Sequence, residues 1–175
     1  MNNFYLYLIL ISIVFIISIF NAIYLTLYNK NVAIKFISIL LIFMIIYLSS
    51  FKEVFLPFLS NAVYPPSLIP SEIHPSKTNY SFEYNFNYPN GTKVIYWAAE
   101  NNSPNLNDIY DNPHEAYGLY KNSGIAIINN NKAVLHINYP DKYKIPTGNI
   151  LKPHIHYRIA MPNNPILSEV RTIFI

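Results

Sequence analysis

Cysteine is absent from the 175-residue sequence. This absence excludes disulfide bonds, thiolate metal sites and cysteine nucleophiles. A folded domain of this chain must therefore be held together by burial of its core, or by core burial together with a metal ion.

Charged side chains are scarce: Lys, Arg, Asp and Glu make up 12% of the residues, and the net charge is +3. No long basic cluster accompanies this small positive charge, so the sequence lacks the electrostatic footprint of a nucleic-acid-binding protein. Glycine-rich phosphate loops, the G-x-S-x-G turn of hydrolases and paired carboxylates are missing as well. The sequence therefore predicts no nucleic-acid partner and gives no sign of phosphate-loop or hydrolase chemistry.

Two long runs near the N-terminus contain no charged side chain. Residues 4–28 form a run of about 25 residues, which as a helix is long enough to cross a hydrocarbon core of about 30 Å. Residues 36–50 form a shorter run bracketed by Lys35 and Lys52, whose long side chains can reach the membrane surface. Both runs are apolar on every face, unlike the helices of a soluble core, and the first lacks the basic start of a signal peptide. Residues 1–59 are therefore predicted to be a membrane anchor, a transmembrane hairpin of two helices.

The lysines predict the orientation of this hairpin. Lys30 and Lys35 lie in the short connector between the two runs, whereas the residues before the first run carry no charged side chain. Because positive charge favours the cytoplasmic side, we expect the connector in the cytoplasm and the region after the anchor on the opposite side. The chain is thus predicted to be an integral, multi-pass membrane protein with a non-cytoplasmic C-terminal domain.

The rest of the chain divides into two parts. Residues 60–77 are predicted to be a linker, because four prolines within them favour an extended, semi-rigid backbone. Residues 78–175 show short β-like runs separated by turn residues and no helical period, which predicts an all-β domain with an antiparallel sandwich or barrel. The predicted strands are 80–88, 93–99, 124–128, 133–138, 151–160 and 168–175. The polar stretch 100–123 is long for a loop of a compact domain, and such loops are commonly functional or disordered.

The candidate site begins with His154 and His156, the only closely spaced pair of histidines. On a strand, side chains two residues apart point to the same face, so both imidazoles can bind one metal ion. The alternative is that both are ordinary polar residues on a half-exposed strand. His74, His114 and His136 are expected to be structural or surface residues.

The last part of the chain resembles the catalytic domain of the intradiol ring-cleavage dioxygenases. The resemblance lies in residues 140–146 (PDKYKIP) and 152–158 (KPHIHYR), which match the family's Pro-x-x-Tyr-x-x-Pro segment and its His-x-His segment. Residues 88–97, a turn and a strand ending in Trp, and residues 170–174 extend it over roughly 88–175. The resemblance implies an antiparallel β-sandwich of the intradiol dioxygenase type.

The resemblance also implies a ligand set for a non-haem ferric ion, Fe³⁺. In the family two tyrosines and two histidines bind the iron, which here implies Tyr143, His154 and His156. The second tyrosine is expected from the loop 100–123, where Tyr110 and Tyr120 are taken as candidates and Tyr117 as a further alternative. Phenolate oxygen is a hard donor, so two phenolates together with two imidazoles favour Fe³⁺.

The expected catalytic residue is Lys152. It stands where the family has an arginine, so it keeps the positive charge but lacks the planar guanidinium. The chain also departs from the family in that Pro153 directly precedes His154, and the stretch from Tyr143 to His154 is shorter.

Three functions are consistent with these features. The first is a membrane-anchored intradiol dioxygenase that cleaves a small aromatic diol, a catechol-type ring, with O₂. The second is a catalytically inactive β-sandwich that retains the fold as a binding or surface-structural module. The third is a zinc or copper site with three ligands. The sequence leaves the oligomeric state open.

Overall fold

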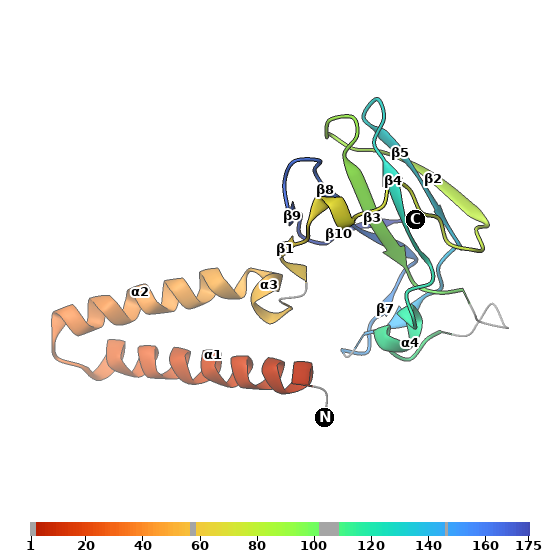
Figure 1. Cartoon of the computed structure of the whole chain (residues 1–175). Coiled ribbons are helices and arrows are strands. Elements are labelled where there is room, and N and C mark those ends of the chain that lie inside the picture. The colour runs from red at the N-terminus through yellow and green to blue at the C-terminus, as the bar shows by residue number, and fades with distance from the viewer. Residues whose placement is uncertain (1–2, 57–58, 102–108, 146) are drawn as a thin grey trace. The chain divides into compact units, whose positions relative to one another are not determined.

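The computed structural model describes residues 3–56, 59–101, 109–145 and 147–175. The chain divides into two compact units, Met1–Ser60 and Asn61–Ile175 (Figure 1). The first unit is helical and the second is rich in β-strands, so each is described by itself.

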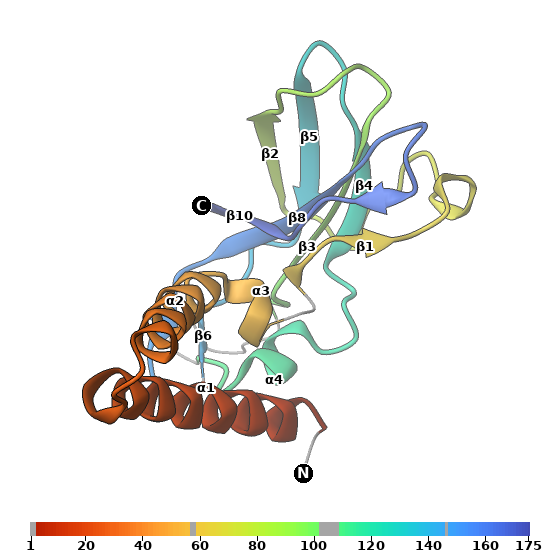
Figure 2. The same ribbon diagram turned by 90° about the vertical axis from the view of Figure 1, so that its left-hand side faces the viewer.

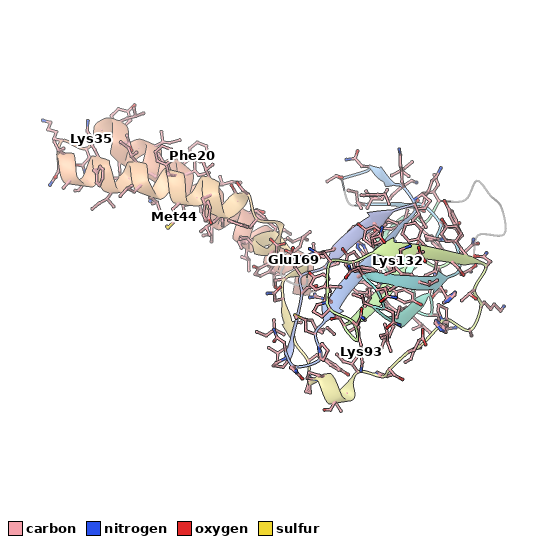
Figure 3. All side chains as sticks on the ribbon, turned by 90° about the horizontal axis from the view of Figure 1, so that it is seen from above. Phe20, Lys35, Met44, Lys93, Lys132 and Glu169 are labelled. Carbon is pink, nitrogen blue, oxygen red and sulfur yellow. The ribbon has the colours of Figure 1, made fainter. Side chains whose placement is uncertain are left out.

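The first unit contains three helices, α1 (Asn3–Tyr28), α2 (Val32–Ser49) and α3 (Lys52–Phe55). The segments Leu6–Tyr28 and Val32–Ser49 are long and apolar enough to cross a membrane. Their side chains are mostly exposed, and Figure 3 shows Phe20 and Met44 on the outside of the hairpin, where Phe20 is 71% exposed. The two apolar N-terminal helices predicted from the sequence are confirmed.

The connector between α1 and α2 is tightly hydrogen-bonded. Asn31 caps α2, because its side-chain oxygen accepts a hydrogen bond from the backbone N–H of Ala33 at 2.9 Å. The side-chain oxygen of Asn29 accepts one from the backbone N–H of Asn31 at 2.8 Å. Asparagine is favoured at such caps because its short side chain reaches the first free N–H groups of the helix.

The second unit is built from small antiparallel sheets (Figures 1 and 2). Its strands are β1 (Ala62–Val63), β2 (Tyr80–Asn85), β3 (Lys93–Ala98), β4 (Ser123–Ile127), β5 (Lys132–Ile137), β6 (Tyr143–Lys144), β7 (Ile150–Leu151), β8 (His154–Ala160), β9 (Ile166–Leu167) and β10 (Arg171–Phe174). The largest sheet has the order β10-β8-β3-β4, and the pairs β2-β5, β1-β9 and β6-β7 form three two-stranded sheets. The predicted antiparallel β-structure is therefore confirmed in outline.

One core cluster joins the four-stranded sheet to the β2-β5 pair. Val94, Tyr96 and Ile155 come from the first, and Leu135 and Ile137 come from the second. All five are fully buried. Because successive side chains of a strand point to opposite faces, the residues between these core positions lie on the other face of the four-stranded sheet.

The segment predicted to be a linker forms part of the second unit. β1 pairs with β9, and Ile73 forms an antiparallel bridge with Ile125. Ile69 is buried, and its carbonyl accepts a hydrogen bond from the Lys93 ammonium. The prolines keep this segment extended. Its apolar side chains pack on the sheet because burial of apolar surface lowers the free energy of the folded chain.

The polar stretch 100–123 contains a short helix, α4 (Pro113–Tyr117). The side-chain oxygen of Asn112 accepts a hydrogen bond from the N–H of Glu115 at 2.9 Å, and Pro113 occupies the first turn. Both residue types are favoured at these positions. Residues 102–108 of this stretch lie outside the described residues.

Candidate metal centre

β8 places both histidines of the His-x-His pair on one face of the four-stranded sheet. The Nε2 atoms of His154 and His156 lie 3.2 Å apart. His156 is opposite Trp97 on β3 and Thr172 on β10 in the strand register. The strand geometry expected for the pair is thus present, with His154 buried and His156 half-buried.

Tyr143 reaches the pair from β6. This short strand is held by its pairing with β7, in which Tyr143 lies opposite Leu151. The Tyr143 hydroxyl lies 3.0 Å from His154 Nε2, and the side chain is buried. Tyr143 and His154, eleven residues apart, are therefore in direct contact.

Tyr117, the last residue of α4, completes a cluster of four side chains. Its hydroxyl lies 3.0 Å from the Tyr143 hydroxyl and 3.2 Å from His154 Nε2. Its ring centroid lies 5.8 Å from that of His156. The side chain is only 7% exposed. We call Tyr117, Tyr143, His154 and His156 the donor cluster.

The three tyrosines of the stretch 100–123 differ in how they approach the donor cluster. The ring of Tyr120 stacks on that of Tyr117, with the centroids 5.6 Å apart, and the side chain is 54% exposed. Tyr110 forms a backbone bridge with Tyr143 and packs beside it. Tyr117 takes the inner position because one helical turn buries Ala116 and Tyr117 together against Ala99.

A local signal in the sequence points to this outcome. Asn112, Pro113 and Glu115 have the spacing of a helix start, with a capping side chain, proline in the first turn and an acidic residue near the N-terminus. A short helix beginning at Pro113 ends near Tyr117. The prediction of Tyr110 and Tyr120 from the sequence did not take this signal into account.

Hydrogen bonds fix the orientation of the two imidazoles. Nδ1 of His154 donates to the carbonyl oxygen of Lys152 at 2.6 Å, since a carbonyl can only accept. The neutral ring then carries a bare Nε2 that faces both tyrosine hydroxyls. Nδ1 of His156 lies 2.9 Å from Thr172 Oγ1, which can accept in the same way. Metal-binding histidines are typically oriented by such a second hydrogen bond.

Burial favours the neutral forms of Tyr117, Tyr143 and His154. Burial raises the pKa of the Tyr117 hydroxyl strongly, and it also raises the pKa of Tyr143. The pKa of His154 is lowered, again chiefly by burial. Phenolates at these positions therefore require a bound positive charge to stabilise them.

The spacing of the four donor atoms fits a metal ion. Nitrogen and oxygen ligands lie about 2.0–2.2 Å from a tetrahedral ion, which places them roughly 2.8–3.6 Å from one another for angles between about 90° and 109°. Four of the six separations between the donor atoms fall in this range: 3.0 Å between the two tyrosine hydroxyls, 3.2 and 3.0 Å from the hydroxyls of Tyr117 and Tyr143 to His154 Nε2, and 3.2 Å between the two Nε2 atoms. Two facing Nε2 atoms, each with its Nδ1 turned toward an oxygen, are an arrangement that a shared cation stabilises.

Other candidates lie elsewhere. Lys152 has an exposed side chain, and its contact with the donor cluster is made by its backbone carbonyl. His74 and His136 pack against each other at 4.6 Å. Within the described ranges, no group of three or more His, Cys, Asp or Glu side chains is placed to hold a metal ion. The donor cluster differs from such groups in that two of its four side chains are tyrosines.

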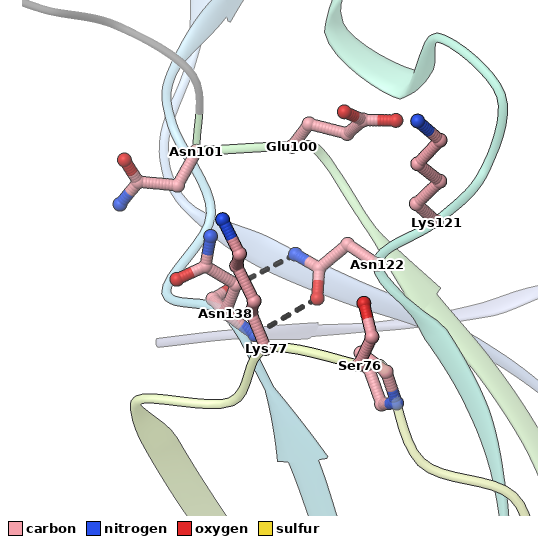
Figure 4. Close-up of a pocket in the computed structure, with 8 residues that line it drawn as sticks. Ser76, Lys77, Glu100, Asn101, Lys121, Asn122 and Asn138 are labelled. Carbon is pink, nitrogen blue, oxygen red and sulfur yellow. Dashed lines mark hydrogen bonds between the residues drawn. The ribbon is translucent and has the colours of Figure 1, made fainter.

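A polar hollow of about 270 Å³ lies outside the donor cluster (Figure 4). Its lining includes Lys77, Glu100 and Lys121. The buried amide of Asn122 donates to the carbonyl of Asn138 and accepts from its N–H, at 2.7 and 2.9 Å. These bonds join two loops of the domain, so the amide has a structural role.

Comparison with known proteins gives no family for this chain: no protein-family model and no curated protein matches it.

Proposed function

We propose that this chain is a membrane-anchored dioxygenase of the intradiol type. Tyr117, Tyr143, His154 and His156 would hold a non-haem ferric ion, and the substrate would be a small aromatic diol. The observation that carries this proposal is the convergence of two tyrosine oxygens and two imidazole nitrogens, from three separate elements, within 3.0–3.2 Å contacts. The family resemblance implies this set of four ligand types.

The donor set favours iron over other metals. Two phenolate oxygens are hard, negatively charged ligands that neutralise much of the charge of Fe³⁺, whereas imidazole also suits zinc and copper. A ferric ion held here would bind both oxygens of the diol and would activate its ring for reaction with O₂. The overall change adds both oxygen atoms of O₂ to catechol, C₆H₆O₂, and gives muconic acid, C₆H₆O₄.

The chain's own residues would orient the substrate and move its protons. His154 and His156 are fixed by Lys152 and Thr172, so their Nε2 atoms cannot turn away from the donor cluster. Tyr117 and Tyr143 would hold the ion through their hydroxyl oxygens, each of which would be deprotonated. Either phenolate oxygen could accept a proton from the diol, because the two oxygens lie 3.0 Å apart at the donor cluster.

The architecture proposed for the domain is the β-sandwich of the intradiol type. Its support is the shared core of the four-stranded sheet and the β2-β5 pair. The anchor would span the membrane twice and hold this domain on the non-cytoplasmic side, as the two lysines of the connector favour. The two apolar helices support the spanning role by their length and composition.

The test uses the full chain purified in detergent micelles and loaded with Fe³⁺. We expect one iron per chain, a visible tyrosinate-to-iron charge-transfer band, and O₂ uptake with catechol that yields muconate. Tyr117→Phe and Tyr143→Phe should each weaken or shift the band and should together abolish it, while Tyr120→Phe should leave it unchanged.

Each alternative gives a different result. An iron-bound, coloured chain that takes up no O₂ with any diol indicates the inactive binding module. Preferential binding of zinc, unaffected by Tyr117→Phe, indicates the three-ligand site. A chain that binds neither metal after loading contradicts the proposal.

A further inference from the structure

An apolar groove lies on the same face of the four-stranded sheet as the histidines. It has a volume of about 260 Å³ and runs over β3 and β4. Its side walls include Ile95 and Trp97 from β3, Ser123 and Ile125 from β4, and Ile73 and Tyr120 from the neighbouring segments. None of the lining residues is charged.

Two aromatic rings that line the groove also contact members of the donor cluster. The ring of Trp97 lies 5.7 Å from that of His156, its cross-strand partner. On the other side, Tyr120 stacks on Tyr117 with an interplanar angle of 16°. A molecule bound between Trp97 and Tyr120 therefore touches the neighbours of two proposed metal ligands.

Tyr120 is held in an unusual backbone conformation. Its φ is 56°, in the left-handed region that bulky side chains rarely adopt. Its N–H donates to the carbonyl of Tyr117 at 2.7 Å, and its own carbonyl accepts from Ser123 Oγ at 2.7 Å. Strain of this kind persists where surrounding contacts hold the residue in place, and here it keeps an aromatic ring at the rim of the groove.

We propose that this groove binds an apolar ring substituent of the substrate, so that the preferred substrate is an alkyl- or aryl-substituted o-diphenol and not a carboxylated one. The inference rests on the proposed function, which places the diol itself at the donor cluster. Burial of hydrocarbon in an uncharged groove contributes about 0.8 kcal/mol of binding free energy per CH₂ group, whereas the groove offers a carboxylate no compensating charge. A tert-butyl group on the ring should therefore tighten binding at least about tenfold over catechol.

The experiment reads the groove directly, because Trp97 is the only tryptophan in the chain. Quenching of its fluorescence is measured in the full chain in micelles, without O₂, both metal-free and loaded with iron. The probes are 4-tert-butylcatechol, catechol and 3,4-dihydroxybenzoate. We expect the first to bind about tenfold tighter than catechol, and the last to bind more weakly than catechol.

Two variants alter the groove and one serves as a matched control. Tyr120→Gly removes the ring and relieves the backbone strain, so the preference for the tert-butyl compound should disappear. Ser123→Lys places a cation in the groove and should shift the preference toward 3,4-dihydroxybenzoate. Leu119→Ala changes an exposed side chain that does not line the groove and should behave as the unmodified chain. Partition of a probe into the micelles is equal for all variants, so the differences between them isolate the groove.

Equal affinities for the three diphenols, or a tert-butyl preference that survives Tyr120→Gly, would overturn the inference. The proposed function fails separately. If iron loading gives no charge-transfer band while the tert-butyl preference is present, the groove remains an apolar binding site but its occupant is not a substrate of an iron enzyme. If the band is present and the three affinities are equal, only the groove assignment fails.

Discussion

The two faces of β8 carry different residue types and have different consequences. Ile155, Tyr157 and Ile159 point into the core shared with the β2-β5 pair. His154 and His156 point the other way, toward the tyrosines of the donor cluster. One strand thus supplies core packing with every second residue, and it supplies two members of the donor cluster with residues between them.

The same contrast holds for the tyrosines. Tyr96 on β3 is fully buried in the core, and its hydroxyl both donates to the carbonyl and accepts from the N–H of His136. Tyr117 and Tyr143 are also buried, but their hydroxyls meet each other and His154. Burial alone therefore does not distinguish a structural tyrosine from a candidate ligand; the partners of its oxygen do. The following substitutions compare core residues with residues of the donor cluster.

The largest effect on stability is expected on the core face. Ile155→Ala removes a fully buried side chain and should lower the free energy of unfolding by about 2–5 kcal/mol, because a cavity is left behind. His156→Ala, on the next residue of the strand, should lower it by less than about 1 kcal/mol in the metal-free chain. Denaturation followed by circular dichroism measures both. Equal losses would remove the distinction between the faces.

The largest effect on metal binding is expected from Tyr117. Tyr117→Phe removes a proposed ligand oxygen while keeping the buried ring, so iron affinity should fall by more than about 100-fold, beyond the loss expected for a residue that only supports a ligand. The charge-transfer band should shift or vanish. Tyr120→Phe and Tyr110→Phe are the matched controls and should retain iron in a competition titration with a chelator. A larger loss in either control would identify that tyrosine as the ligand in place of Tyr117.

A smaller effect is expected from Thr172, which contacts the donor cluster only through His156. Thr172→Val removes the partner of His156 Nδ1 at 2.9 Å and should weaken iron binding by about 10–100-fold. Thr172→Ser keeps the hydroxyl and should restore binding. An unchanged affinity and an unchanged absorption spectrum in Thr172→Val would show that His156 does not need this support.

The smallest effect is expected for Tyr96→Phe, which removes one buried hydroxyl and should cost about 1 kcal/mol at neutral pH. Burial raises the pKa of Tyr96 from 10.0 to about 12. Between these values the hydroxyl ionises only in the unfolded chain, so unfolding releases a proton and stability falls as pH rises. Below about pH 10 this contribution is fully retained.

The measurement is the thermal midpoint of the metal-free chain between pH 9 and pH 12, compared between Tyr96→Phe and the unmodified protein. We expect a shallower decline in the variant. Parallel curves would mean that the hydroxyl of Tyr96 ionises equally in both states.

Periodicity in the sequence was a good guide to the elements. The two charge-free runs correspond to α1 and α2, because length and uniform apolarity are local properties of the chain. The alternating runs correspond to strands for the same reason. The sandwich remains a proposal, because alternation says which residues share a face but not how several small sheets are assembled.

The proline-rich segment shows where composition misleads. Proline content correctly predicts an extended backbone, yet β1 and Ile73 pair with strands far along the sequence. Whether an extended segment is a spacer or an added strand depends on the partner edge that the rest of the fold presents. That edge is a tertiary feature.

The sequence by itself determined three members of the donor cluster, since strand alternation puts His154 and His156 on one face and the family resemblance adds Tyr143. Only the tertiary structure decided the fourth. Tyr117 was one of three tyrosines in a long polar stretch, and its position depends on a short capped helix packing Ala116 and Tyr117 against Ala99. The physical reason is that the direction of a side chain in an irregular loop is set by its contacts with distant residues, and not by a period that can be counted along the chain.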